Sequence, residues 1–346
     1  MKALHSLMTP DLAIFTPPVV AKPPVGPIQV RPYRVQDGIT QSMLSTFLTC
    51  KYKSKITLAG WQPSGRVSVF DYGELIHRLI ENGSKINQND TDAKADSAIL
   101  KEWHDEQLAH GASIEDLDTA EGKAAAVWPV YCTKYESRDA NLKVKFIEGL
   151  FDTVWNGYRL RGKIDGLFSY AGQTDLWLLE NKSKGQISED AIEDLLVSDF
   201  QSLFYLVALM NMGYIIKGVL YNIIRTPQQR FGKKDTKDTF LARIAAAVRE
   251  DPNHFFRRYE IVFTSQMLQR FEFELRAKLA DFVNNVSISS FPGHDFECYH
   301  NETACLGRGA CPFIRHCATD DFTGYVQTSE AFRELNEGGD NIPSLV

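Results

Sequence analysis

The chain has 346 residues, of which 44% are hydrophobic and 24% charged, and its formal net charge at pH 7 is −6. This is ordinary globular composition, with room for one large or two modest domains. No apolar run approaches the roughly 20 residues that span a bilayer, and the N-terminus lacks the uninterrupted apolar segment of a secretory signal. We therefore expect a cytoplasmic protein with no membrane partner.

The N-terminal third is expected to begin with an arm and continue in helices. Residues 1–36 contain seven prolines, which predicts an extended or disordered segment. Apolar residues three and four apart predict a short helix over 42–50. An acidic cap at Asp71, with Glu74 three residues later, predicts a second helix. A polar, helix-rich insert is expected from about 83 to 140.

From residue 143 the pattern changes to strands, expected at 144–148, 158–165 and 176–180. Turn residues at 156–157 and 171–172 separate them, which predicts an antiparallel meander.

One long helix from Glu189 to Met212, capped by Ser188, is expected next. A strand at 218–224 and a helix at 265–284 follow. This order indicates an α/β fold with a mixed central sheet flanked by helices. We expect a single domain over 37–322 and a C-terminal tail at 323–346.

The sequence has three basic clusters, two of them with aromatic neighbours, and such clusters could neutralise phosphates while the rings stack on bases. They are Lys51, Lys53 and Lys55 with Tyr52; Arg225, Arg230, Lys233, Lys234 and Lys237; and Arg257 and Arg258 beside Phe255, Phe256 and Tyr259. Solvated surface charge explains each cluster equally well. The net negative charge argues mildly against a nucleic-acid binder, although active-site carboxylates make it a weak guide.

A carboxylate–lysine pattern lies in the predicted meander. Glu180 and Lys182 end one strand, and residues two apart on a strand point to the same face. Hairpin pairing could bring Asp165, at the end of the preceding strand, beside them. Two converging carboxylates suit Mg²⁺ or Mn²⁺, and a neighbouring lysine can stabilise charge that develops on a phosphate. By itself, E-x-K is more often a surface ion pair.

Further residues accompany this pattern. Gln201 and Tyr205 lie four apart on the following predicted helix and so share one face. His77, on the helix before the sheet, is by itself more often a packed or surface residue than a ligand. Neutral imidazole nevertheless suits Mn²⁺, so His77 could complete a metal site.

Together these elements resemble the RecB-type branch of the PD-(D/E)XK nucleases. The match comprises Gly73-x-x-x-His77, Gly162-Lys163-Ile164-Asp165-Gly166, Glu180-Asn181-Lys182 and Gln201-x-x-x-Tyr205, and from His77 to Tyr205 it spans 129 residues. The resemblance implies a restriction-endonuclease-like core. It implies that His77, Asp165 and Glu180 bind the metal and that Lys182 is the catalytic lysine. Gln201 and Tyr205 would support the site or contact DNA.

The chain has six cysteines, four of them within residues 298–317. Clustered thiols in an intracellular protein indicate metal rather than disulfides. Gaps of six, five and five residues fit the C-x₂₋₄-C pairs of zinc sites poorly, and four thiolates would suit a [4Fe–4S] cluster.

The resemblance extends to these cysteines. Its iron–sulfur members, among them CRISPR-associated exonucleases and helicase-associated nuclease subunits, take one ligand from before the core and three from the C-terminus. By that resemblance Cys50, Cys311 and Cys317 are ligands. The other ligand is Cys305 or Cys298, and Cys305 is favoured because Gly307 and Gly309 let the backbone wrap closely. Such a cluster would staple the two ends of the domain. Cys132 is expected to be buried packing.

The sequence thus predicts a metal-dependent DNA nuclease, an exonuclease of recombination, repair or processing that acts on single strands or DNA ends. It contains no G-x-x-x-x-G-K-[ST] loop, so a helicase motor would belong to a partner. A non-catalytic DNA-binding scaffold and an iron–sulfur redox protein are the alternatives. The Asp165, Glu180 and Lys182 set favours the nuclease.

Overall fold

The computed structural model describes residues 33–64, 72–87, 90–109, 112–185, 191–230, 232–288, 299–306, 310–328, 332, 335 and 340–346. The proline-rich arm, apart from residues 33–36, lies outside this part of the chain. The expected caps Asp71 and Ser188 lie outside it too, as do Cys298, Gly307 and Gly309.

The secondary structure alternates helices with long strands. Besides a short 3₁₀ turn, η1 (Val35–Asp37), the helices are α1 (Gln41–Thr49), α2 (Lys51–Leu58), α3 (Tyr72–Asn87), α4 (Asp96–Ala109), α5 (Ile114–Asp139), α6 (Ile192–Val197), α7 (Phe200–Asn211), α8 (Lys237–Glu250), α9 (Pro252–Phe255), α10 (Ser265–Ile288), α11 (Glu302–Cys305) and α12 (Ile314–Thr319). The strands are β1 (Trp61–Pro63), β2 (Leu142–Trp155), β3 (Tyr158–Tyr170), β4 (Leu176–Lys184), β5 (Ile216–Arg225), β6 (Phe256–Val262) and β7 (Tyr325–Gln327).

The central sheet has five strands in the order β2-β3-β4-β5-β6. The β4–β5 pair is parallel, and the β2–β3, β3–β4 and β5–β6 pairs are antiparallel. Strands β2, β3 and β4 form the predicted meander, with Asn156 and Gly157 both at positive φ in the first turn. Seven consecutive residues of β5, from Gly218 to Ile224, are buried, as expected for a strand covered on both faces. The predicted mixed sheet is confirmed.

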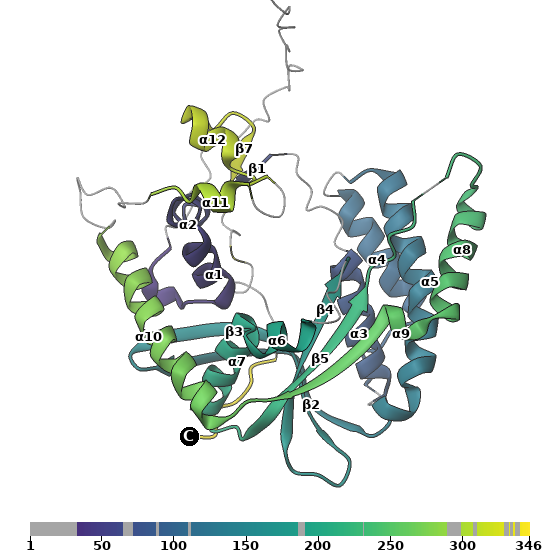
Figure 1. Cartoon of the computed structure of the whole chain (residues 1–346), viewed down its shortest axis with the longest axis horizontal. Helices are drawn as coiled ribbons and strands as arrows, with labels where there is room; N and C mark the ends of the chain where they lie inside the picture. The colour runs from purple at the N-terminus through teal and green to yellow at the C-terminus, as the bar shows by residue number, and fades with distance from the viewer. Residues whose placement is uncertain are drawn as a thin grey trace, which may run out of the picture.

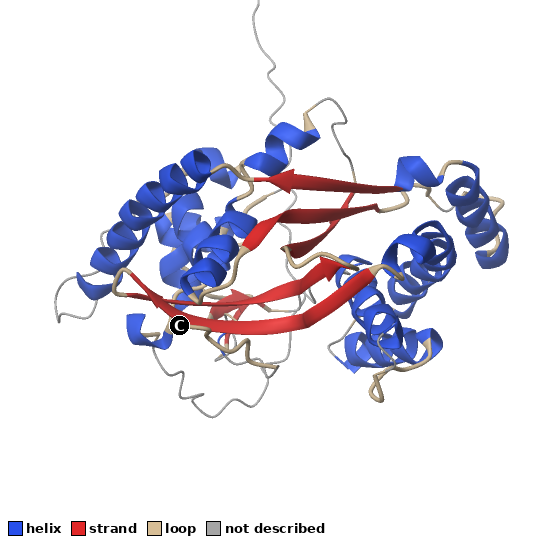
Figure 2. Cartoon of the chain, turned by 90° about the horizontal axis from the view of Figure 1, so that it is seen from below, coloured by secondary structure: helices blue, strands red, loops and turns tan. Residues whose placement is uncertain are grey.

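Helices pack against the sheet in two groups, which Figure 1 shows on either side of it and Figure 2 shows from below. One hydrophobic cluster joins α1, α7 and α10 to β3, β4 and β5. A second joins α3, α4, α5 and α8 to the ends of β5 and β6, around the fully buried Trp103. The helices α4 and α5 occupy the region expected to be a helix-rich insert.

The single helix expected from Glu189 to Met212 is wrong: the described part of this segment forms two helices, α6 and α7. The chain leaves helical geometry at Asp199, whose φ and ψ are −67° and 108°. The Asp199 carboxylate accepts hydrogen bonds from the backbone N of Ser202 at 3.2 Å and from its Oγ at 2.8 Å. Asp199 therefore caps α7, and this cap ends the continuity that apolar spacing suggested.

Distant parts of the sequence meet in a small unit beside α2. Strand β1 pairs antiparallel with β7, and Trp61 stacks on Phe322 with ring centroids 4.0 Å apart. Tyr52 and His316, 264 residues apart, are joined by a 3.2 Å hydrogen bond. Figure 1 shows α11, α12 and β7 lying next to α2. None of the described helices is both long and apolar enough to cross a bilayer.

Candidate active site

Strand β4 places Glu180 and Lys182 together, as the strand alternation predicts. Glu180 is 2% exposed, and Lys182 Nζ lies 3.2 Å from Glu180 Oε1. Because both side chains belong to an interior strand, their positions are set by the sheet and not by a flexible loop. The arrangement differs in this respect from an ordinary surface ion pair.

Asp165 joins them where two strands separate. The β3–β4 pairing runs from Ser169 opposite Leu176 to Gly166 opposite Leu179. The residue before Gly166 on β3 is Asp165, and here a side chain replaces the backbone pairing. Asp165 Oδ2 accepts a hydrogen bond from the backbone N of Asn181 at 2.6 Å. A side-chain carboxylate thus satisfies an N–H that a continuing strand would have paired. This contact fixes Asp165 beside the E-x-K strand.

The carboxylate of Glu180 is in an unfavourable environment for its charge. Burial raises the pKa of Glu180 well above its ordinary value, and the nearby negative charge of Asp165 raises it further. Among the residues that the structure describes, Glu180 Oε2 is buried and has no hydrogen-bond partner. A divalent cation at Asp165 and Glu180 would satisfy this oxygen and offset the repulsion, so the donor set fits a hard metal ion.

His77 reaches the same place from α3. Its Nδ1 lies 3.9 Å from Asp165 Oδ1, with the imidazole about one-third exposed. The structure therefore brings His77 and Glu180, far apart in the sequence, to the one carboxylate of Asp165.

Lys182 has a second acidic partner that the sequence did not reveal. Its Nζ lies 3.2 Å from Asp199 Oδ1, on the residue that caps α7. Burial alone would lower the pKa of Lys182, but the carboxylates of Glu180 and Asp199 outweigh it and raise that pKa. Lys182 is therefore held as a cation. The only sign of this contact in the sequence was an aspartate two residues before Gln201, and it lay in a segment predicted to be one continuous helix.

Glu148 is another acidic residue that the sequence reading missed. Together with Glu81 and Asp165 it lines a cavity between α3 and strands β2 to β4. Burial and the charge of Asp165 raise the pKa of Glu148, while Lys163 forms an ion pair with it at 2.7 Å. Its φ of 50° is unusual inside a strand. The rim of the site is thus more acidic than the motif alone indicated.

Gln201 and Tyr205 share one face of α7, as predicted, with Gln201 Nε2 3.4 Å from Tyr205 Oη. Tyr205 is 8% exposed and packs edge-to-face on Phe151, with ring centroids 5.5 Å apart. A Cβ at Gly162 would meet the Phe151 ring at 2.6 Å, so the glycine of the β3 motif makes room for this packing. The predicted DNA contact of the pair stays a prediction.

The cysteines predicted as ligands come from separate segments into the unit beside α2. Cys50 lies between α1 and α2, and its Sγ accepts a 3.5 Å hydrogen bond from Lys53 N at the start of α2. Cys305 ends α11, and its carbonyl accepts from the backbone N of Cys311 at 3.1 Å. Burial raises the pKa of Cys317 to about 11, and the charges of Cys311, Cys305 and Cys50 raise it as well. The four thiols are therefore near enough to influence one another.

Two expectations are corrected. Cys132 is exposed on α5, so its expected role as buried packing is wrong. The side chain of Arg258 is only 5% exposed and pairs with Asp139, so it is not a surface contact for phosphate. The sequence suggested a basic cluster because burial by α5 cannot be read from neighbouring residues.

A further set of possible metal ligands lies in the helical region, where atoms of His104, Asp118 and Glu121 are within 4.8 Å of one another. His104 Nδ1 already contacts Glu121 at 2.9 Å, and Lys237 forms an ion pair with Asp118 at 3.0 Å. These groups are thus paired with one another and with a lysine.

Comparison with protein-family models supports the nuclease assignment. The sequence model described as the PD-(D/E)XK nuclease superfamily matches residues 39–318, which include every residue of the site. None of the curated proteins matches the chain. Among solved structures, the chain is similar to a Eubacterium rectale protein that is proposed to be an exonuclease, at 12% identity and a TM-score of 0.45, over 82% of this chain and 93% of that one. On the family match, the chain belongs to the PD-(D/E)XK nuclease superfamily.

Proposed function

We propose that this nuclease is a metal-dependent deoxyribonuclease of the RecB-like branch, with Mg²⁺ or Mn²⁺ held by His77, Asp165 and Glu180. The observation that carries the proposal is the buried Oε2 of Glu180, which finds no hydrogen-bond partner in the described part of the chain and lies near a second carboxylate, Asp165. A protein that needed Glu180 only for packing would leave a costly group unsatisfied. If Glu180 is a metal ligand, this oxygen is instead available to bind the ion.

Each residue has a distinct task in the proposed reaction. When bound, the divalent ion supplies a water of lowered pKa and Lewis-acid stabilisation of the phosphate. Lys182, kept cationic by Glu180 and Asp199, donates to a phosphate oxygen as negative charge accumulates there. Asn181 N holds Asp165 in place through the 2.6 Å hydrogen bond. Gln201 and Tyr205 support the site from α7 or contact DNA.

The substrate proposed is DNA, at its ends or in single strands, and the reaction is exonucleolytic in recombination, repair or processing. Because the chain has no Walker-type loop, a helicase or recombination partner would supply any motor. A DNA-binding scaffold with a degenerate site is the alternative. The retained Asp165, Glu180 and Lys182 set favours the enzyme over that scaffold.

We also infer a [4Fe–4S] cluster held by Cys50, Cys305, Cys311 and Cys317, with a structural role. Three observations support it: the wide spacing of the thiols, their mutual influence on the pKa of Cys317, and the position of Cys50 at the N-terminus of α2. The first N–H groups of a helix are free to contact a ligand at that end, and Lys53 N already donates to Cys50 Sγ at 3.5 Å. A redox function would leave the carboxylate–lysine site unexplained.

A gel assay tests the proposed function. Purified protein is incubated with end-labelled linear single-stranded DNA, linear duplex and circular single-stranded DNA, each with Mg²⁺, Mn²⁺ or excess EDTA. The proposal expects the linear substrates to be shortened only with metal and the circle to stay intact. Cleavage of the circle would show an endonuclease. If folded protein cuts none of the three with either metal, the scaffold alternative replaces the enzyme.

A further inference from the structure

A buried polar network lies on the face of the sheet opposite Glu180 and Lys182. Asn181, the residue between them, points to that face because side chains alternate along a strand. It is 5% exposed, and its Oδ1 accepts a hydrogen bond from Asn222 Nδ2 at 2.8 Å. Asn222 is its register partner on the parallel neighbour β5. The preceding residues on this face of β4, Trp177 and Leu179, are apolar, so a polar residue here calls for an explanation.

Asn222 connects Asn181 to helix α5 and strand β6. Its Nδ2 also donates to Tyr131 Oη at 2.8 Å, and its Oδ1 accepts from Arg258 Nε at 3.2 Å. Asn222 is 1% exposed, so these contacts satisfy the amide in place of water. The side chain therefore has its orientation fixed by three different elements.

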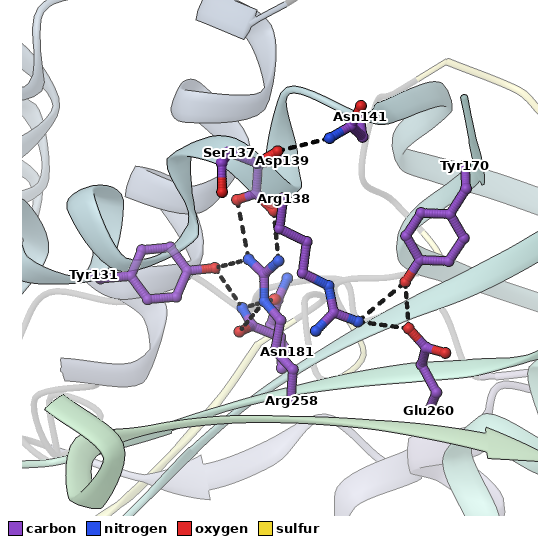
Figure 3. Close-up of polar contacts among 10 residues, drawn as sticks. Tyr131, Ser137, Arg138, Asp139, Asn141, Tyr170, Asn181, Arg258 and Glu260 are labelled. Carbon is purple, nitrogen blue, oxygen red and sulfur yellow. Dashed lines mark hydrogen bonds and ion pairs between the residues drawn. The ribbon is translucent and has the colours of Figure 1, made fainter. Parts of the chain in front are cut away.

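Arg258 anchors the other end of the network, as Figure 3 shows. Its Nη2 donates to Asp139 Oδ2 at 3.0 Å and to Tyr131 Oη at 2.8 Å. The guanidinium also lies over the Tyr135 ring, 3.7 Å from its centroid. With its charge paired and four of its hydrogen bonds made within the network, the buried guanidinium is held in one place, and buried polar networks of this kind favour a single geometry.

We propose that Asn181 is a positioning residue through which this network, defined as Tyr131, Asp139, Asn181, Asn222 and Arg258, orients Asp165. The side chain of Asn181 is held by Asn222, and its backbone N–H holds Asp165 Oδ2 at 2.6 Å. One residue thus joins a rigid anchor at α5 to a proposed metal ligand on β3. The inference rests on the proposed function of Asp165.

A neighbouring network provides a matched control. Arg138, Tyr170 and Glu260 link α5, β3 and β6, with Arg138 Nη2 3.1 Å from Tyr170 Oη (Figure 3). It lies over the same sheet and likewise joins an arginine to a tyrosine and a carboxylate, although the Arg138 and Glu260 side chains are 37% and 41% exposed. Within the described residues its hydrogen bonds run between these three side chains, and Asn181 takes no part in them. Substitution Glu260→Gln therefore perturbs a polar network beside α5 without acting on Asn181.

The test compares Asn181→Ala, Asn222→Ala, their double variant and Glu260→Gln with the wild-type protein. Measured quantities are the Mn²⁺ dissociation constant by electron paramagnetic resonance, kcat and KM for linear DNA, and the thermal midpoint. Because outer partners of metal ligands typically contribute about 10- to 100-fold, we expect Asn181→Ala to weaken Mn²⁺ binding and lower kcat by about tenfold, with KM for DNA nearly unchanged. The double variant should be no worse than the single ones, since both break one connection.

The outcomes are distinguishable. Wild-type values of Mn²⁺ affinity and kcat in folded Asn181→Ala overturn the positioning role, as does an equal loss in Glu260→Gln. A wild-type protein that neither binds Mn²⁺ nor cleaves DNA overturns the proposed function and the inference with it. If Asn181→Ala fails to fold, Tyr131→Phe replaces it, because only one hydroxyl of the network is lost. A smaller loss of Mn²⁺ affinity in that variant supports the role, and an unchanged affinity contradicts it.

Discussion

At the scale of single residues, the site is governed by how much negative charge the fold brings together. Glu180 is buried, and Asp165 and Asp199 both add to the charge around it. Lys182 offsets part of this charge. In the metal-free protein, burial of Glu180 and repulsion from its acidic neighbours therefore destabilise the proposed metal site. A bound cation would relieve this destabilisation.

This penalty predicts how stability depends on pH. Burial raises the pKa of Glu180 in the folded state above its ordinary value of 4.5, so between those two pKa values the folded state binds more protons than the unfolded state. The free energy of unfolding contributed by Glu180 is thus present at low pH and is lost as pH rises through the raised pKa. Relative to wild type, metal-free Glu180→Gln should gain stability from pH 4.5 upward. Urea unfolding across pH checks this, and a pH-independent difference would contradict it.

The motif residues could be predicted at this scale, but their partners could not. The proximity of Asp165, Glu180 and Lys182 was predicted because strand alternation and a hairpin are local rules. Asp199 was missed because its role depends on a helix that stops, and Arg258 was misread as a surface cation. Both errors concern contacts between segments, which local sequence patterns do not record.

At the scale of elements, the break between α6 and α7 connects folding with the site. Asp199 caps α7 and also forms an ion pair with Lys182, 3.2 Å away. A continuous helix from 192 to 211 would have no residue in that capping geometry. Capping and ion pairing can be separated by replacing Asp199 with asparagine, because a neutral amide still accepts the capping hydrogen bond.

Substitutions at Asp199 should therefore differ in stability while agreeing in activity. Asp199→Ala loses the cap, which should lower the free energy of unfolding by about 1 kcal/mol. Asp199→Asn retains the cap and loses the charge beside Lys182. Both should cleave DNA more slowly than wild type. Urea unfolding and initial cleavage rates measure the two effects. Wild-type cleavage by Asp199→Asn would show that the charge of Asp199 does not serve the reaction.

Among elements, the meander was predictable, since turn residues mark its ends, whereas β6 was not. The sequence of β6 places Arg257, Arg258 and Glu260 among its aromatic residues, which hides the alternation typical of a strand. Arg258 and Glu260 pair with Asp139 and Arg138 of α5, so their polarity has a tertiary reason. The helix at 265–284 was predicted well and extends to Ile288.

At the scale of the whole molecule, the unit beside α2 brings the two ends of the nuclease core together. In the sequence, Cys50 precedes the strands of the central sheet and the cysteines at 305–317 follow them. The pairing of β1 with β7 is a second connection between these two parts of the chain. A cluster shared between them would stabilise the folded chain by linkage, since unfolding separates its ligands.

The iron–sulfur proposal predicts colour, iron content and stability together. Anaerobically purified protein should be brown and contain about four irons per chain. Cys50→Ser should lose the iron and lower the thermal midpoint by several degrees, because tight ligand binding to the folded state is lost. Cys132→Ser, on the exposed face of α5, is the control and should keep both. Stoichiometric zinc without iron in the wild-type protein would contradict the cluster and leave the nuclease proposal standing.

The central claim is that Asp165 and Glu180 hold a metal that drives phosphodiester hydrolysis. The most direct test is the initial rate of cleavage of linear DNA in Mn²⁺ by wild type, Asp165→Asn and the control Asp175→Asn, whose carboxylate forms an exposed ion pair with Lys217 at 3.1 Å. Metal stabilisation is worth several kcal/mol, so Asp165→Asn should be slower by at least about a hundredfold, with Asp175→Asn unchanged. Equal rates in wild type and folded Asp165→Asn would contradict the account.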